Sequence, residues 1–545
     1  MRDDRPWAAI LPWLVVLFAL VAWLGRVDLL TPDEARHAEI AREMFLEGHW
    51  LTPRIYGEGY YDKPALFYWL TGASIWAFGT TAWAARLPSV LGALFSVGMT
   101  SWWVRRAWGS GAAHWVVLLL GTTLFFVAVG RYVVIDMLLT AAMTGALCWL
   151  GVVLADPPSR RRPMWPMYAC TAVGVLAKGP VALVIVGGVA VVAAVFERRP
   201  TLLLRLHPVR GLLLMAALAG PWYAAAYAID PAYIRTFLWE HNFARYAVPG
   251  ALAHQEPWYF YLLAMPIVML PWSILVPTAV AAAWKNPSAG VRHALAWATV
   301  IIGFFSFSQT KVPTYVLGAF PPLLALVAVY IDDRLTRRVE LPRAMEFAAV
   351  GWTFVAAAVA VGGAMWVIIA RPSDWHHTPL AAAAVAVAVW TYRHAHDDQS
   401  VPSAMVLSSL ALIAMVYGSA ADAVNARESQ KGAAEIIKVL LPPHAALTSY
   451  RVAPHAMAFY AGRYVRRADD PESAVPELVA GDDAALLTRA KFLPELGLEP
   501  MPSWMSVAWG SADGQVLVVG GSLAERFAEG GDWRRREGVE PSIGR

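Results

Sequence analysis

Charged residues are scarce in this chain. Lys, Arg, Asp and Glu make up 15% of its 545 residues, against about 25% in ordinary soluble proteins. Hydrophobic residues account for 58% of the chain, and the mean hydropathy is +0.48. This composition excludes a soluble globular protein. The net charge of +4 is small, so we expect no nucleic-acid partner.

Cysteine is almost absent, because the chain holds only Cys148 and Cys170. Both lie inside apolar runs, and two cysteines so placed give neither a disulfide framework nor the spacing of a metal motif. We expect both to be small side chains of the apolar core.

Apolar runs are what the chain has in abundance. Runs of about 18 residues or more recur from Trp7 to Ala420, and each is long enough to cross a hydrocarbon core of about 30 Å. They predict a mostly α-helical, polytopic membrane protein with about thirteen transmembrane helices. We expect residues 165–196 to form two spans broken at Lys178-Gly179-Pro180. Residues 66–103 should form one span and an interfacial helix, interrupted near Arg86 and Pro88.

The first apolar run, Trp7 to Leu24, resembles a signal peptide only superficially. It is longer than a signal-peptide core, and no A-x-A-like cleavage site precedes Arg26. We expect it to be retained as the first span.

Basic loops mark one side of the membrane, since short loops rich in Lys and Arg stay in the cytoplasm. The basic groups recur between alternate pairs of spans, as an up-and-down chain requires. They are Arg105-Arg106, Arg160 to Arg162, Arg198 to Arg210, Lys285 with Arg292, and Arg334 to Arg343. This pattern predicts a cytoplasmic N-terminus, and it places residues 26–64 and the tail after Ala420 outside the cytoplasm.

The composition divides the chain into two domains. Residues 1–420 form the membrane domain, with residues 26–64 as its first outer loop, and residues 421–545 form a polar tail. We expect the tail to be a small α/β domain. Its expected strands are 444–450, 484–489, 506–509 and 515–519, its expected helices are 454–461 and 472–480, and its last residues should be disordered.

Thr31-Pro32-Asp33-Glu34 opens the most polar stretch of the membrane domain. Thr31 suits a helix N-cap, Pro32 the first helical position and Glu34 a capping-box partner. The helix that follows should be amphipathic and lie in the membrane interface, with Ile40, Met44 and Phe45 on one side. Taken alone, the four residues are explained by this capping role.

Other polar loops on the predicted outer side favour a functional site. Each charge could be a capping or snorkelling group. Arg131 could pair with Asp136, and Lys178 could mark a simple re-entrant break. Together they would supply carboxylates for base chemistry and cations for phosphate. These loops contain Tyr60 to Pro64, Arg131 with Asp136, Lys178, Glu240 to Arg245, His254, and Lys311 with Tyr315.

A divalent metal is a weaker expectation, because no local metal motif is present. A His with one or two carboxylates could hold such an ion. Asp62 with His241 or His254 is the combination that we expect, with Zn²⁺, Mg²⁺ or Mn²⁺ as the ion.

These motifs taken together resemble the bacterial aminoarabinose transferases, which are GT-C membrane glycosyltransferases alongside the protein mannosyltransferases. The resemblance covers about residues 26–325. It is carried by the acidic pair after the first span and by Tyr61-Asp62-Lys63-Pro64, Arg131…Asp136, Leu176 to Pro180, Glu240-His241, and Ser308…Lys311…Tyr315, with a weaker echo in Phe459-Tyr460…Arg463.

The resemblance implies a fold of thirteen spans with interfacial helices and a periplasmic C-terminal domain. It implies transfer of a sugar, 4-amino-4-deoxy-L-arabinose, from undecaprenyl phosphate to a lipid A phosphate at the bacterial inner membrane, in a monomer. This activity is lipopolysaccharide modification of the kind linked to polymyxin resistance. Asp62 stands where the family often has Glu, and the tail is short for the family.

The expected roles follow from this resemblance and from the residue chemistry above. Asp33 is the expected catalytic carboxylate, and Asp136 and Glu34 are further acidic residues of the site. Lys63, Tyr315, Arg245 and Lys311 are expected to hold the carrier phosphate. The expected substrate-binding residues are Tyr61, Arg36, Arg131 and Lys178. The expected metal ligands are Asp62, His241 and His254.

Two other functions compete with this one. The same chemistry could serve another acceptor, such as lipid A core, a protein or a cell-wall glycan. A transporter or flippase should have polar groups near mid-span and two matching halves, and the sequence has neither.

Overall fold

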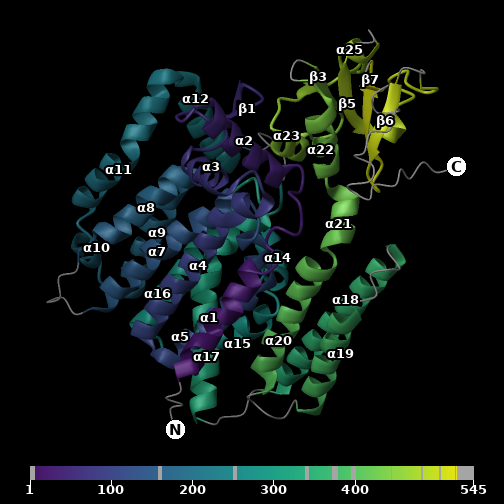
Figure 1. Ribbon diagram of the computed structural model, residues 1–545. Coiled ribbons are helices and arrows are strands. Elements are labelled where there is room, and N and C mark those ends of the chain that lie inside the picture. Colours follow the sequence, from purple (N-terminus) through teal and green to yellow (C-terminus); the bar gives the residue numbers. More distant parts are fainter. Residues whose placement is uncertain are drawn as a thin grey trace.

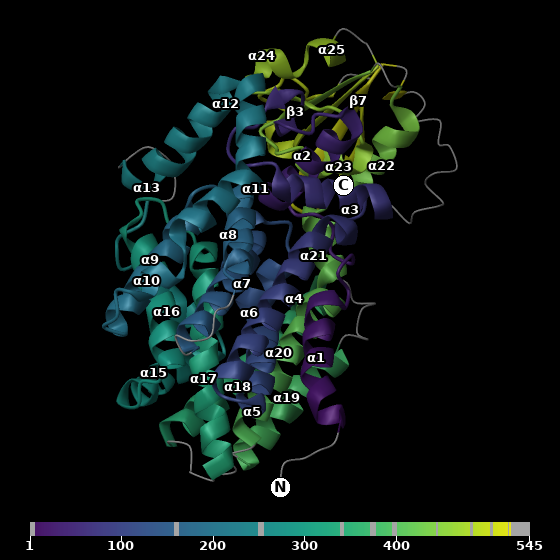
Figure 2. The same ribbon diagram turned by 90° about the vertical axis from the view of Figure 1, so that its left-hand side faces the viewer.

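The computed structural model describes residues 6–156, 163–248, 255–337, 343–370, 378–394, 400–442, 445–479, 483–501, 505–521 and 523–524. Helices form a tall bundle, and a small sheet domain stands at one end of it (Figure 1). The first helix begins at the opposite end of the bundle from this sheet domain (Figures 1 and 2). The predicted mostly α-helical architecture is therefore confirmed.

The helices of the bundle follow the apolar runs of the sequence. They are α1 (Pro6–Val21), α2 (Asp33–Glu47), α3 (Leu66–Phe78), α4 (Ala82–Ala107), α5 (Ser110–Thr122), α6 (Leu124–Gly130), α7 (Ile135–Ala155), α8 (Trp165–Lys178), α9 (Val181–Phe196), α10 (Leu202–Arg205), α11 (Pro208–Ile229), α12 (Pro231–Arg235), η1 (Thr236–Ala244), α13 (Arg245–Ala247), α14 (Phe260–Val268), η2 (Trp272–Leu275), α15 (Val276–Lys285), α16 (Ala289–Phe307), η3 (Pro313–Ala319), α17 (Phe320–Arg337), α18 (Arg343–Ala370), α19 (Thr378–Arg393), α20 (Ser400–Ala414) and η5 (Met415–Ser419).

Within the described residues, seven helices are long and apolar enough to cross a membrane, or up to nine if each of two bent pairs is one span. Four shorter apolar helices of 10–17 residues accompany them: 9–21, 66–78, 181–196 and 381–393. The chain is therefore a multi-span membrane protein. The expected number of thirteen spans stays a prediction.

One of the two expected breaks lies where the sequence places it, and the other does not. Helix α8 ends at Lys178 and α9 begins at Val181, as predicted. Helix α4, however, runs unbroken through Arg86 and Pro88. The interruption lies earlier, between Phe78 and Ala82, where Gly79 has φ +86° and ends α3. A proline in a long helix bends it without ending it when neighbouring helices support the chain.

The capping interpretation of Thr31 to Glu34 is wrong. No side chain caps the N-terminus of α2. Glu34 is fully buried, and both of its carboxylate oxygens accept hydrogen bonds from Arg86 at 2.8 Å. The same carboxylate accepts the N–H groups of Leu30 at 3.0 Å and Val133 at 3.1 Å. Glu34 therefore joins three segments of the fold, and this contact set assigns it a structural role.

Helix α2 does not expose the polar face that the sequence predicts, and its position in the membrane interface stays a prediction. Its expected polar residues Glu39 and Glu43 are fully buried. Glu39 accepts two hydrogen bonds of 2.7 Å from Arg42, and Glu43 accepts the N–H groups of Tyr56 and Gly57. Helix α2 packs between α3 and α23 (His455–Ala461), so the C-terminal residues cover its polar side.

The tail forms a five-stranded sheet in the order β4 (Arg466–Ala468), β3 (Ala446–Tyr450), β5 (Ala484–Arg489), β7 (Gln515–Gly520) and β6 (Met505–Gly510). Strands β3 and β4, and β3 and β5, pair in parallel, whereas β5, β7 and β6 pair antiparallel. Three predicted strands and the first predicted helix are confirmed by β5, β6, β7 and α23. Strand β3 begins at Ala446, and residues 443–444 and 525–545 lie outside the described residues.

The elements of the tail are α21 (Ala421–Glu428), α22 (Lys431–Leu440), β3 (Ala446–Tyr450), α23 (His455–Ala461), β4 (Arg466–Ala468), α24 (Pro471–Ala474), α25 (Pro476–Val479), β5 (Ala484–Arg489), η6 (Ala490–Phe492), β6 (Met505–Gly510) and β7 (Gln515–Gly520). The predicted second helix, 472–480, is two short helices, because Val475 and Pro476 interrupt it. A separate two-stranded hairpin, β1 (Arg54–Ile55) with β2 (Glu58–Gly59), lies in the first outer loop.

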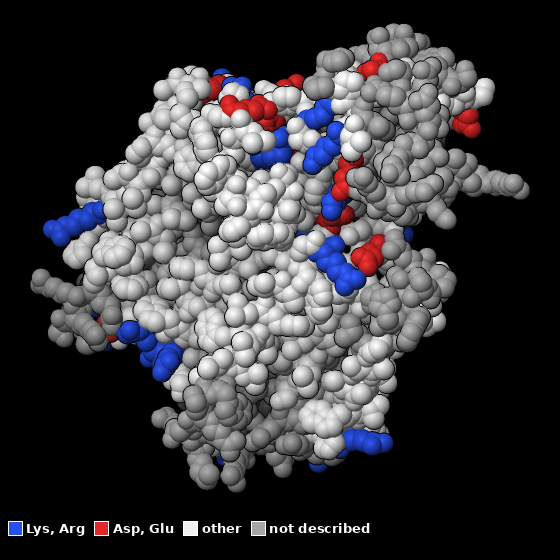
Figure 3. Space-filling view, in the orientation of Figure 1, with Lys and Arg blue, Asp and Glu red and all other residues white. Residues whose placement is uncertain are grey.

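Polar contacts join the tail to the first outer loop. Arg26 forms an ion pair of 2.9 Å with Asp422, and Ser429 donates a hydrogen bond to Asp28 at 2.7 Å. Tyr460 accepts the N–H of Leu29. Figure 3 shows Lys, Arg, Asp and Glu gathered near this end of the molecule, above a broad uncharged band over the middle of the bundle. The uncharged band is the surface that lipid would cover.

Candidate functional site

A cavity of about 290 Å³ lies at the bundle end that faces the sheet domain. Its walls are formed by helix α8, the first turn of α9, η1, α16 and η3. One part of its lining is basic and polar, and the other part is aliphatic and aromatic. The lining residues are Lys63, Lys178, Pro180, Val181, Val184, Phe237, Leu238, His241, Asn242, Phe243, Arg245, Tyr246, Phe304, Phe305, Ser308 and Tyr315.

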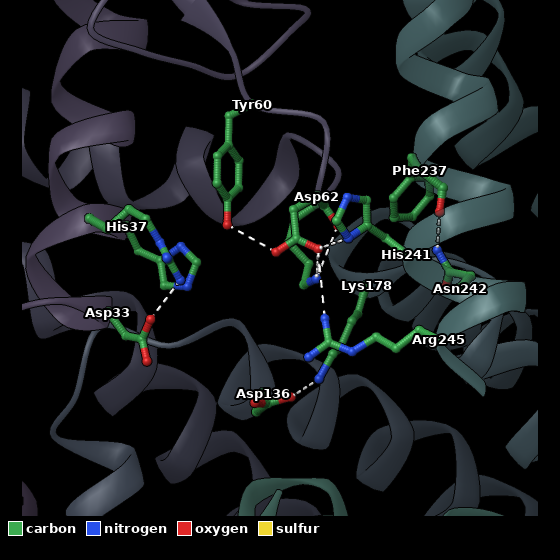
Figure 4. Close-up of polar contacts among 12 residues, drawn as sticks. Asp33, His37, Tyr60, Asp62, Asp136, Lys178, Phe237, His241, Asn242 and Arg245 are labelled. Carbon is green, nitrogen blue, oxygen red and sulfur yellow. Dashed lines mark hydrogen bonds and ion pairs between the residues drawn. The ribbon is translucent and has the colours of Figure 1, made fainter. Parts of the chain in front are cut away.

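Asp62 is the centre of the polar groups at this cavity (Figure 4). Its Oδ1 lies 2.6 Å from Lys63 Nζ, 2.8 Å from His241 Nδ1 and 3.8 Å from Arg245 Nη1. Tyr60 donates a hydrogen bond of 3.0 Å to its Oδ2. One carboxylate therefore gathers two or three cationic groups from the first outer loop and from η1 and α13, which are nearly 180 residues apart in sequence.

The charges of this cluster shift one another's protonation. Burial would raise the pKa of Asp62, but Lys63 and His241 outweigh it and hold that pKa below its usual range. Burial lowers the pKa of Lys63 to about 8, and Lys178 and Arg245 lower it while Asp62 opposes the shift. Asp62 is therefore a fixed anion, and the cluster keeps an excess of positive charge for an anionic ligand.

Lys178 closes the cavity from the end of α8. Its ammonium group pairs with Asp136 and lies 4.3 Å from the centre of the Tyr315 ring. Thr314 donates a hydrogen bond of 2.8 Å to the other oxygen of Asp136. Gly179 makes this turn possible, because its φ of +93° disfavours a side chain and a Cβ there would meet Phe237 at 2.6 Å.

Asp33 lies at the start of α2, apart from the Asp62 cluster (Figure 4). Its Oδ1 accepts a hydrogen bond of 2.6 Å from Arg36, and 62% of its side chain is exposed. The guanidinium carbon of Arg36 lies 5.9 Å from the centre of the Tyr60 ring. Asp33 is thus an accessible carboxylate, held by one cation and near the tyrosine that contacts Asp62.

Three residues that were expected to bind substrate or phosphate make contacts elsewhere in the protein, namely Arg131, Lys311 and Tyr61. Arg131 donates to the carbonyls of Ala19 and Ala22 at 2.8 and 2.6 Å and stacks on Tyr417. Lys311 donates to the carbonyls of Glu256 and Ser308, and neither residue lines the cavity. These contacts hold the ends of helices and loops, because a buried cation must find acceptors.

Tyr61 is the third such residue, and it does not line the cavity either. It donates a hydrogen bond of 2.5 Å to Asp230, and its ring packs edge-on against Tyr233. The expected alternative that Arg131 pairs with Asp136 is wrong, since Lys178 takes that place. His254 lies outside the described residues.

Asp62 and His241 are the two expected metal ligands that the fold brings together. Within the described residues, however, no three His, Cys, Asp or Glu side chains gather as a metal site. Asp62 is also bonded to Lys63, and Arg245 lies close by. These cations would repel a divalent ion, so the donor set does not fit a ready-made metal site. The expected metal stays a prediction, and no step below depends on it.

The sequence assigned no role to three residues that support the site. Tyr60 donates a hydrogen bond to Asp62, and Tyr233 donates one of 2.5 Å to the carbonyl of Lys63. Thr314 donates one to Asp136. Tyr60 and Thr314 do belong to polar stretches that the sequence marks, Tyr60 to Pro64 and Gln309 to Tyr315. Tyr233 carried no such signal, because its partner Lys63 lies 170 positions away.

Part of the chain is similar to known proteins. A family model of dolichyl-phosphate-mannose-protein mannosyltransferases matches residues 8–233. Undecaprenyl phosphate-alpha-4-amino-4-deoxy-L-arabinose arabinosyl transferases of Edwardsiella ictaluri and Aeromonas salmonicida are 33% and 32% identical to the chain over 328 and 332 residues. Over this part, the chain is similar to the bacterial aminoarabinose transferases. The expected resemblance is confirmed.

The matched part covers 59% of this chain and 59–60% of those two aminoarabinose transferases, so it spans about three fifths of their length. The solved structure of ArnT from Cupriavidus metallidurans bound to undecaprenyl phosphate has a TM-score of 0.77 and 24% identity, and the match covers 94% of this chain and 98% of that one. The apo structure of the same protein gives a TM-score of 0.75. The predicted fold class, a GT-C-like helical membrane protein, is confirmed.

Proposed function

We propose that this protein is a membrane glycosyltransferase that moves 4-amino-4-deoxy-L-arabinose from undecaprenyl phosphate to a phosphate of lipid A. The observation that carries the proposal is the cavity in which Lys63, Arg245 and Lys178 gather beside an apolar wall. A phosphate attached to a hydrocarbon chain needs a cationic surface for the phosphate and an apolar surface for the chain. The similar proteins named above carry undecaprenyl phosphate, 4-amino-4-deoxy-L-arabinose and arabinosyl transfer in their names.

The donor binds with its phosphate at the cationic end of the cavity. Lys63 and Arg245 supply charge and hydrogen-bond donors to the phosphate, and Tyr315 lies at the same wall. The first isoprene units pack against residues such as Val184, Phe304 and Phe305. The sugar then extends from the phosphate toward α2, where Asp33 lies.

The transfer exchanges one bond for another at the anomeric carbon. A phosphate oxygen of lipid A forms a bond to that carbon while the bond to the carrier phosphate oxygen breaks. The leaving carrier phosphate gains a negative charge, and Lys63 and Arg245 stabilise it. Asp33 orients the attacking phosphate and accepts its proton when that phosphate arrives protonated. Asp136 keeps Lys178 in place at the cavity wall.

The protein acts in the bacterial inner membrane, with its catalytic end and C-terminal domain in the periplasm. A second candidate keeps the same donor class and exchanges the acceptor for a protein hydroxyl. The match of residues 8–233 to the protein mannosyltransferase model favours it.

The experiment supplies the purified protein with undecaprenyl-phosphate aminoarabinose and lipid A, and measures modified lipid A by mass spectrometry. We expect transfer by the native protein and a loss of about 100-fold or more for Asp33→Asn, the usual range for removing an acid–base group. Asp469→Asn, at an exposed carboxylate of the tail, is the matched control and should keep full activity.

Normal turnover by Asp33→Asn would remove Asp33 from the mechanism. Release of undecaprenyl phosphate with a protein acceptor, and none with lipid A, would favour the second candidate. Movement of lipid without any covalent product would overturn both in favour of a flippase.

A further inference from the structure

His37 is a polar residue of α2 to which neither the sequence nor the mechanism above assigns a role. It lies four residues after Asp33, so both side chains lie on one face of the helix. Figure 4 shows His37 on the same side of the site as Asp33, with Tyr60 and Asp62 across the centre. Only 9% of His37 is exposed. A nearly buried imidazole beside the carboxylate of the site needs a physical explanation.

The Nδ1 atom of His37 has a clear partner. It lies 3.1 Å from the hydroxyl oxygen of Tyr68 on α3, which is fully buried. Within the described residues, His37 is the only hydrogen-bond partner of that hydroxyl. If Tyr68 accepted from Nδ1–H, its own O–H would be buried without an acceptor, which is unfavourable. The favoured arrangement therefore has Tyr68 donating to Nδ1, which leaves the ring proton on Nε2.

The ring is also neutral. Burial lowers the pKa of His37 to about 3, and Arg36 and Lys63 lower it as well, whereas Asp62 and Asp136 oppose the shift. The same charges place His37 within the electrostatic reach of both halves of the site. A neutral Nε2–H is a hydrogen-bond donor that adds no charge, so its natural partner is a neutral oxygen and not the phosphate.

We propose that His37 binds the sugar of the donor, with Nε2–H donating a hydrogen bond to a sugar hydroxyl or ring oxygen, and that Tyr68 positions the ring for this contact. The inference rests on the proposed function, because that function supplies the sugar between the phosphate cluster and Asp33. His37 is then a residue that distinguishes the sugar-bearing carrier from the sugar-free carrier.

The experiment compares the affinities of the detergent-solubilised full-length protein for two ligands, undecaprenyl-phosphate aminoarabinose and undecaprenyl phosphate, by calorimetry. His37→Phe keeps a ring and removes both nitrogens. We expect it to weaken binding of the sugar-bearing carrier about tenfold, as for one lost hydrogen bond, with binding of undecaprenyl phosphate unchanged. His37→Gln, whose amide can donate from a similar position, should recover most of the loss.

Tyr68→Phe separates positioning from direct contact. It leaves the imidazole in place and removes the donor that fixes its tautomer, so it should weaken the sugar-bearing carrier less than His37→Phe and leave undecaprenyl phosphate unaffected. Thermal unfolding of each variant in the same detergent checks that the fold is retained.

Equal weakening of both ligands by His37→Phe, or of neither, would overturn the role of His37 and leave the proposed function standing. No binding of either ligand by the native protein would instead overturn the proposed function itself and the inference with it.

Discussion

The charge of the Lys63 ammonium group is subject to opposing electrostatic effects. Asp62 stabilises its charge at 2.6 Å, while burial and the nearby cations disfavour the charge. Tyr233 fixes the backbone carbonyl of the same residue. The result is an ammonium group in a fixed position whose pKa lies close to the physiological range. A ligand phosphate would add the negative charge that the cluster lacks.

This balance predicts a pH dependence for carrier binding. With a pKa of about 8, Lys63 is charged below pH 8 and loses its proton above it, so the affinity for undecaprenyl phosphate should fall as pH rises from 8 to 9.5. Well above the pKa the fall approaches tenfold per pH unit. Lys63→Arg should remove most of this dependence, because a guanidinium stays charged. Titration of binding against pH checks both proteins, and a flat profile for the native protein would contradict the assignment.

At the level of single residues, the sequence identified which side chains have suitable chemistry better than it identified the contacts that they make. Asp62, Lys63, His241 and Arg245 do come together. Arg131, Lys311 and Tyr61 looked equally suitable, because a cation or tyrosine that bonds another part of the protein looks the same in the sequence as one that binds a ligand. Only the contacts distinguish them. The roles of all these residues in catalysis stay predictions.

Among the elements, α2 is positioned by a close crossing with α3. A Cβ on Gly72 of α3 would lie 2.1 Å from the Phe45 ring and 2.9 Å from the carbonyl oxygen of Ala41, so only glycine fits there. The Glu34–Arg86 pair fixes the other end of α2 against α4. Together these contacts set the position of Asp33 at the start of the helix.

Gly72→Ala should therefore disturb α2 while adding only one methyl group. We expect a loss of about 1–3 kcal/mol in stability, as for other overpacked cores, and a larger loss of activity, because Asp33 moves with α2. Gly303→Ala is the matched control, since Gly303 lies inside helix α16 and a Cβ there meets nothing within 4 Å. Thermal unfolding in detergent and the transfer assay measure the two effects. Equal behaviour of both variants would show that the crossing can adjust.

For the molecule as a whole, the sheet domain lies at the opposite end of the bundle from the start of the first helix (Figure 1). The contacts of Arg26, Asp28 and Leu29 with the tail make the C-terminal domain a cover over α2. The alternating basic loops predict that this end lies outside the cytoplasm. A monomeric state stays a prediction.

Reporter fusions test this orientation. Alkaline phosphatase, which is active only outside the cytoplasm, should be active when it is fused after Arg545 and inactive when it is fused after Arg106. Green fluorescent protein at the same positions should give the opposite pattern. Activity of the phosphatase after Arg106 would reverse the predicted sides and would exclude the periplasmic reaction.

The sequence by itself determined the membrane class, the break at Lys178-Gly179-Pro180 and most of the tail's strands. Each of these depends on local composition or periodicity, which a linear pattern records. Only the tertiary structure decided that Glu34 pairs with Arg86, that the polar side of α2 is buried under α23, and that His37 contacts the hydroxyl of Tyr68. A charged residue looks the same in a sequence whether it contacts water or a distant side chain. The distant partner is brought to it only by the tertiary fold.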